Sequence, residues 1–182
     1  MIDSANRYGG VAIFLHWTVA VLVVIVGILG LLHDSWPRAT QAKWINIHAM
    51  IGLAVWVLMM WRLAWRLSHK PPALPQDAGE WSRRLSFPVH FLIYLLLFVI
   101  PAIGIVTFIF HGRVFDFGLF QINPHVKSDR TIFHPTEDIH GYLAYGLFGL
   151  VGLHALAALW HHFVRKDGVL LRMLPKRRSV SG

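Results

Sequence analysis

Four long stretches without a charged residue restrict this chain more than any other feature of its sequence. They are residues 11–32, 44–61, 87–110 and 139–164. About 18 apolar residues are enough to cross the roughly 30 Å hydrocarbon core of a bilayer as a helix. Since 55% of the chain is hydrophobic and only 14% is charged, a water-exposed globule is a poor match. The sequence therefore predicts an all-α integral membrane protein, a single up-and-down four-helix bundle over residues 1–182.

The distribution of basic residues predicts how this bundle is oriented. Five of the 17 Lys and Arg residues lie in the first and third loops, and the rest lie in the N-terminal segment, the second loop and the C-terminal tail. Because cytoplasmic segments are enriched in Lys and Arg, both termini are expected in the cytoplasm of a bacterial inner membrane. Tail residues 172–178 are expected to contact lipid headgroups. The net charge of +8 tracks this topology, so no nucleic-acid partner is expected.

Cysteine is absent from the chain, whereas there are 12 histidines. The lack of thiols excludes covalent attachment of a c-type haem, Cys-ligated iron–sulfur clusters and disulfides within the chain. Any redox centre must therefore use other ligands. An ionisable side chain inside a membrane span is costly, so histidines within the spans are candidates for function.

Four of these histidines match in pairs by their predicted depth. His140 and His154 are 14 residues apart in the last span, which is close to four helical turns, so they share a face about 21 Å apart along the axis. His48 lies near the outer end of the second span and His16 near the inner end of the first. Two such pairs, His48 with His140 and His16 with His154, are what two bis-histidine haems require.

Other readings of these histidines remain open. A single histidine in a span is more often a hydrogen-bonded structural residue or a proton relay. His161 is an alternative inner ligand, one heptad beyond His154, but it lies at the headgroup boundary, and His154 is therefore preferred. Glycines near the pairs would let a porphyrin approach the backbone, or would serve ordinary helix packing: Gly52, Gly141, Gly146, Gly149 and Gly152.

Haem propionates are anionic and need cationic partners or water. For the inner haem the candidates are Arg62, Arg66 and His90, and for the outer haem they are Lys43 and Arg38. Any of these basic residues could instead serve only to set the topology.

Several motifs together resemble the bacterial cytochrome b561 family over nearly the whole chain. They include His16-Trp17, Ile45 to His48, His90, Leu153-His154, His161-His162 and, in the third loop, Phe117-Gly118-Leu119. The tail at residues 166–178, KDGVLLRMLPKRR, is very similar to the C-terminal signature of that family. The family is itself similar to the cytochrome b subunits of nickel–iron hydrogenases and formate dehydrogenases.

The resemblance implies two b haems, with His16, His48, His140 and His154 as axial ligands. It also implies electron exchange with ubiquinone and, in the best-known member, oxidation of periplasmic superoxide. A superoxide:ubiquinone oxidoreductase would favour a positive entrance, yet the predicted outer segments hold five basic and five acidic residues.

The leading hypothesis is transmembrane electron transfer through two haems to the quinone pool, with superoxide or another periplasmic donor. The alternative is a membrane cytochrome b subunit that serves a hydrogenase- or dehydrogenase-type partner. A histidine-lined transporter is a different class, which is less favoured because the four charge-free spans contain no Asp or Glu.

Overall fold

A computed structural model describes residues 7–73 and 79–175, and four of its helices are long and apolar enough to cross a membrane. They are α1 (Gly10–Leu31), α2 (Arg38–Ser68), α3 (Glu80–Phe110) and α4 (Arg130–Trp160). Short elements complete the described chain: η2 (His33–Ser35), β1 (Phe115–Asp116), β2 (Gln121–Ile122), the π-helical turn η4 (His161–Arg165) and η5 (Leu170–Met173). The prediction of an all-α four-helix membrane bundle is confirmed.

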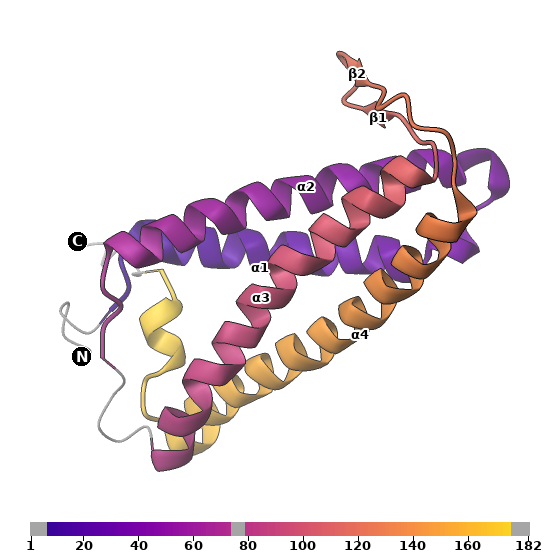
Figure 1. Ribbon diagram of the computed structural model, residues 1–182. Coiled ribbons are helices and arrows are strands. Elements are labelled where there is room, and N and C mark those ends of the chain that lie inside the picture. The colour runs from indigo at the N-terminus through magenta and orange to yellow at the C-terminus, as the bar shows by residue number, and fades with distance from the viewer. Residues whose placement is uncertain (1–6, 74–78, 176–182) are drawn as a thin grey trace, which may run out of the picture.

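The bundle consists of two helical hairpins (Figure 1). Helix α1 packs mainly against α2 and α3 packs mainly against α4, while α2 and α3 join the two hairpins. The beginning of α1 and the short helix η5 lie at the same end of the molecule, and strands β1 and β2 lie at the other end (Figure 1). Here, "inner" denotes the end with η5 and "outer" the end with the strands.

Three of the helices extend well beyond the charge-free stretches. Helix α2 begins at Arg38 rather than near residue 44, and α4 begins at Arg130 rather than near residue 139. Helix α3 begins at Glu80 rather than near residue 87, so Pro88 lies inside the helix. The helix starts earlier because polar residues stabilise it outside the bilayer. Arg84, for example, forms an ion pair with Glu80 one turn before it, at 2.6 Å.

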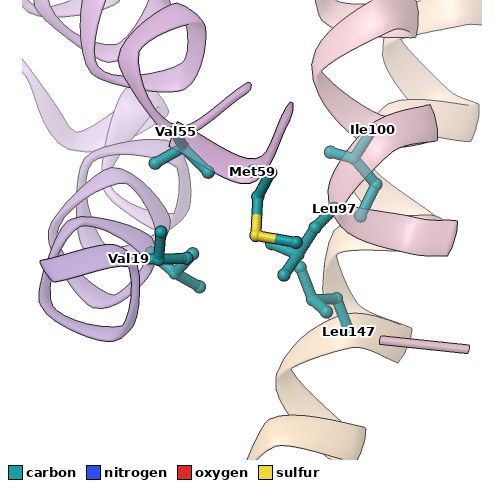
Figure 2. Packing of buried hydrophobic residues seen from close by; sticks show 7 residues of the cluster. Val19, Val55, Met59, Leu97, Ile100 and Leu147 are labelled. Atoms are coloured by element: carbon teal, nitrogen blue, oxygen red, sulfur yellow. The ribbon is translucent and has the colours of Figure 1, made fainter. Parts of the chain in front are cut away.

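The centre of the bundle is a compact apolar layer (Figure 2). Val19 and Val23 from α1 meet Val55 and Met59 from α2, and all are nearly inaccessible to solvent. The remaining members come from the second hairpin: Leu97, Ile100 and Leu147. Leu147 is seven residues from both His140 and His154, so this layer lies midway between the two predicted haem levels.

The third loop forms a small antiparallel hairpin, which the sequence did not predict. In it Phe115 pairs with Ile122 and Asp116 with Gln121. Two hydrogen bonds fasten the hairpin to α2: Asn46 donates its side-chain amide to the Asp116 carbonyl at 2.8 Å, and the Asp116 backbone N–H donates to Asn46 Oδ1 at 3.1 Å. The side chain of Leu119, at the tip, is almost fully exposed.

The C-terminal segment folds back against the inner end of the bundle. The Trp17 indole N–H donates to the Met173 carbonyl at 2.8 Å. Arg172 is buried, donates to the Ala73 carbonyl at 2.8 Å and lies over the Tyr8 ring. The expectation that Arg172 contacts headgroups is therefore wrong, because its guanidinium is used inside the protein. Residues 176–178 of the predicted headgroup-binding tail lie outside the described residues.

Candidate functional site

At the outer end, the structure brings His48 of α2 and His140 of α4 together. Their ring centroids are 6.0 Å apart and the ring planes are inclined by 69°. Metal–imidazole nitrogen bonds are about 2.0 Å long, so two rings that bind one metal from opposite sides have centroids roughly 6 to 6.5 Å apart. The spacing of these rings therefore fits a metal held between them.

Hydrogen bonds define the tautomer of both outer histidines. His48 Nδ1 lies 3.0 Å from the Val26 carbonyl oxygen, and His140 Nδ1 lies 3.0 Å from the Ile100 carbonyl oxygen. Because a carbonyl can only accept, each Nδ1 must carry the proton and donate it. The lone pair of each Nε2 is then free for a metal, and such a backbone contact is the usual way to orient a ligating histidine.

A glycine of a neighbouring helix packs closely against the imidazole ring of each outer histidine. A Cβ atom at Gly104 of α3 would lie 2.9 Å from His140 Cε1, and one at Gly30 of α1 would lie 3.1 Å from His48 Cε1. A Cβ atom at Gly104 would therefore force the His140 ring to move, and one at Gly30 would displace the His48 ring by a few tenths of an ångström. Neither glycine is among those predicted to lie near a haem, since nothing in the sequence shows which glycine faces a histidine across the bundle.

The two outer rings line an apolar cavity formed by all four long helices. Its walls include Val23, Leu97 and Phe148, and it also contains Gly52 and Gly141, as a close porphyrin approach requires. A second, more polar cavity adjoins it at the outer surface and shares part of its lining. Flat apolar cofactors with a few charged groups suit a site that is apolar inside and polar at its mouth.

At the inner end, the structure brings three histidines together. The ring centroids of His16 and His154 are 6.3 Å apart, which again fits one metal between them. His90 of α3 lies closer to His154, at 5.1 Å between centroids, which is short for two rings on opposite sides of a metal. His90 Nδ1 donates to the Ser86 carbonyl at 2.5 Å. The geometry therefore favours His16 with His154 as the metal-binding pair and His90 as its neighbour.

Arg62 places a positive charge near the three inner histidines. It lies within electrostatic reach of His16, His90 and His154. Its Nε donates to the Tyr94 hydroxyl at 2.8 Å, and the guanidinium of Arg66 lies 6.0 Å from the centre of the same tyrosine ring. The two arginines are therefore gathered around Tyr94 on the side of the inner histidines.

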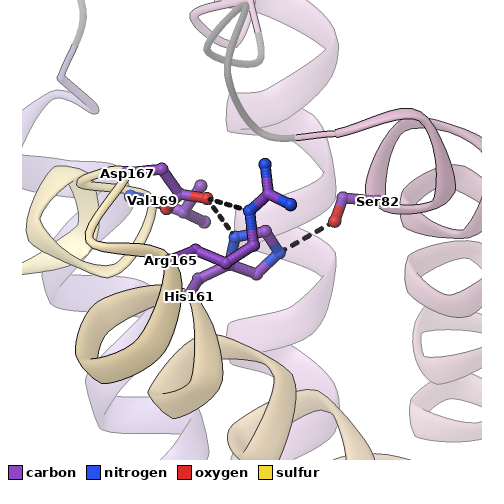
Figure 3. A network of polar contacts seen from close by, with 5 residues as sticks. All are labelled: Ser82, His161, Arg165, Asp167 and Val169. Carbon is purple, nitrogen blue, oxygen red and sulfur yellow. Dashed lines mark hydrogen bonds and ion pairs between the residues drawn. The ribbon is translucent and has the colours of Figure 1, made fainter.

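His161 belongs to a different network at the inner end (Figure 3). Its Nδ1 contacts the carboxylate of Asp167, and its Nε2 lies 2.9 Å from the Ser82 hydroxyl. Arg165 Nε lies 3.7 Å from the same carboxylate. Because both ring nitrogens of His161 already have partners, the ring has no free lone pair for iron in this arrangement. The alternative in which His161 replaces His154 is therefore disfavoured.

The two basic residues that were predicted to bind the outer haem propionates do not lie at the outer site. Lys43 and Arg38 are exposed on the first turns of α2, and neither lines the apolar or the polar outer cavity. Arg113 lines both cavities, as does Glu137. In the sequence, Arg113 is distinguished only as one of the charges of the third loop. The one available signal was its position three residues after the end of the third charge-free stretch.

Known proteins that resemble this chain show the family to which it belongs. The sequence profile of a family described as prokaryotic cytochrome b561 matches residues 7–176. A probable superoxide oxidase CybB from Yersinia pestis is 36% identical, over 96% of this chain and 99% of that protein. Cytochrome b561 homolog 1 from Escherichia coli K12 is 29% identical over 95% and 99% of the two chains, and cytochrome b562 from Cereibacter sphaeroides is 30% identical over 93% and 96%.

The family is one of multi-pass membrane proteins that transfer electrons with b-type haem, and the four membrane-spanning helices agree with that. The earlier resemblance is thus confirmed by a match that covers almost the whole chain. This protein belongs to the prokaryotic cytochrome b561 family and is a membrane electron-transfer protein.

Proposed function

We propose that the chain binds two b haems, the outer one between His48 and His140 and the inner one between His16 and His154, and passes electrons through them to the quinone pool. The observation that carries this proposal is the pair of ring spacings, 6.0 and 6.3 Å, at two levels of one bundle. Haem iron supplies one-electron chemistry by alternating between its ferric and ferrous states.

The residues around the histidines suit electron transfer rather than binding of an exogenous ligand to iron. Two imidazoles per iron leave no open coordination position. The Nδ1 hydrogen bonds of His48 and His140 to backbone carbonyls hold the two rings in place. The layer around Met59 and Leu147 separates the two levels with buried apolar side chains. Four helical turns of α4 join the levels, about 21 Å along its axis.

Superoxide is the proposed electron donor at the outer face, on the ground that the relative at 36% identity is described as a probable superoxide oxidase. Each superoxide ion would lose one electron and become dioxygen. One ubiquinone molecule would take up two electrons and two protons from water to become ubiquinol. Two superoxide ions are thus consumed for each quinone reduced.

The test is quinone reduction by the purified protein in liposomes that contain ubiquinone. Superoxide is generated outside the vesicles, and ubiquinol is quantified after extraction. We expect ubiquinol formation at one per two superoxide ions, which superoxide dismutase and the His140→Ala substitution both abolish. Ubiquinol formation no faster than in protein-free vesicles would overturn the superoxide assignment. Reduction only after a periplasmic dehydrogenase is added would establish the alternative role as a cytochrome b subunit.

A further inference from the structure

Arg113 is positioned at the mouth of the outer site by the end of α3. The helix ends at Phe110, and Gly112 adopts a left-handed conformation with φ of +77°. The backbone N–H of Arg113 then donates back to the Phe108 carbonyl at 3.3 Å. This turn is a common way to end a helix, and it directs the chain back over the bundle. The side chain of Arg113 is consequently half-buried and lines both outer cavities.

The guanidinium of Arg113 is a partly desolvated cation that has no bonded partner among the residues that the structure describes. Burial lowers its pKa, and the nearby carboxylate of Glu137 opposes that effect. Within residues 7–73 and 79–175, no carboxylate or carbonyl lies within hydrogen-bonding distance of this guanidinium. A guanidinium offers five N–H donors in a planar fork, and leaving them unsatisfied out of water is costly. The position therefore favours an additional anionic group.

The cavity that Arg113 shares with His48 and His140 indicates which anion this is. A haem in that cavity would place its apolar ring among the apolar walls, and its carboxylates would have to reach the polar mouth. A guanidinium binds a carboxylate with two parallel hydrogen bonds. We propose that Arg113 binds a propionate of the outer haem, in place of the expected Lys43 and Arg38. This inference depends on the proposed haem at His48 and His140.

The negative charge of Glu137 should act on the outer haem in the opposite direction to the positive charge of Arg113. It lies three residues before His140 on α4, and its charge reaches both Arg113 and His140. A positive charge near a haem favours the reduced iron, which carries less positive charge, and a negative charge favours the oxidised iron. Arg113 therefore raises the midpoint potential of the outer haem, and Glu137 lowers it.

Four single variants of the haem-loaded protein test this inference: Arg113→Gln, Arg113→Lys, Glu137→Gln and Lys43→Gln. For each one, a redox titration followed by absorbance gives the two haem potentials, and transfer to an excess of a haem-scavenging protein gives the rate of haem loss. The component that is missing in His140→Ala identifies the outer haem.

For Arg113→Gln we expect a lower outer-haem potential and haem loss faster by about tenfold, the effect of losing one charge-assisted hydrogen bond. In Arg113→Lys, the outer-haem potential and the rate of haem loss should both lie between those of Arg113→Gln and the wild type. Glu137→Gln should raise the outer-haem potential, and the exposed Lys43→Gln control should change neither quantity. The inner-haem potential should stay near its original value in all four.

The inference is overturned if Arg113→Gln keeps the potential and the retention of the outer haem, or if Lys43→Gln alters them instead. It is also overturned if Glu137→Gln lowers the potential. Should Arg113→Gln fail to fold, Arg113→Lys and Glu137→Gln decide the question by the same criteria. Failure of the proposed function would look different, because wild-type protein would then contain no haem, or His140→Ala would keep both haems.

Discussion

The protonation of two side chains determines what the outer site can bind. His48 and His140 each donate Nδ1–H to a backbone carbonyl, so each directs an unprotonated Nε2 elsewhere. That these two histidines lie at one level could be predicted from the depth of each one in its charge-free stretch. Other features of the site could not be predicted, because they depend on how side chains from distant segments meet. They are the close contacts of Gly104 and Gly30, the direction of Arg113 and the two partners of His161.

Removing one outer histidine should remove one haem. In His140→Ala we expect one haem per chain instead of two, because a single imidazole and an apolar cavity hold the ring much less firmly. His134→Ala is the matched control, since His134 is exposed on the same helix, and it should keep two haems. A pyridine haemochrome assay of purified protein measures this, and two haems in His140→Ala would contradict the ligand assignment.

A single added methyl group should weaken the same site. In Gly104→Ala the new Cβ would lie 2.9 Å from His140 Cε1, so the ring must move away from its position. We expect a lower outer-haem content and an altered outer-haem potential. Gly146→Ala on α4 is the control, because its Cβ would meet nothing within 4 Å. Unchanged spectra and potentials in Gly104→Ala would show that this glycine does not position the ring.

The helices were predictable in number and in their membrane-crossing parts, but their ends were not. Hydropathy marks where a helix is buried in lipid, whereas the helical backbone continues into water wherever local interactions stabilise it. Asp129 shows this for α4, because its carboxylate accepts hydrogen bonds from the Thr131 backbone N–H and hydroxyl, at 2.9 and 2.7 Å. The hairpin of β1 and β2 was missed because each strand has only two residues and is fastened by Asn46 of α2.

Packing between α1 and α4 depends on Gly27. A Cβ atom there would lie 1.8 Å from Phe148 Cζ, so Gly27→Ala forces the phenyl ring out of its place. Overpacking of this kind costs about 1–3 kcal/mol, and we expect a lower midpoint of thermal unfolding in detergent. The second change Phe148→Leu should restore part of the loss. Gly10→Ala, where the added atom meets nothing within 4 Å, should leave the midpoint unchanged, and an equal drop in both variants would contradict this packing.

Orientation in the membrane is a property of the complete chain. The structure places the beginning of α1 and the segment of η5 at one end (Figure 1), and the excess of basic residues predicts that this end faces the cytoplasm. A green fluorescent protein fused after the C-terminus should therefore fluoresce, and alkaline phosphatase at the same position should be inactive. The opposite result would place the outer site on the cytoplasmic side and exclude a periplasmic donor.

The proposed electron transfer across the bilayer requires a haem at each of the two levels. The most direct measurement is the haem content of the purified wild-type protein, from a pyridine haemochrome assay together with its dithionite-reduced minus oxidised spectrum. We expect two b-type haems per chain, both reduced and both low-spin with two histidine ligands. A colourless protein, or one haem per chain after full reconstitution, would contradict this expectation.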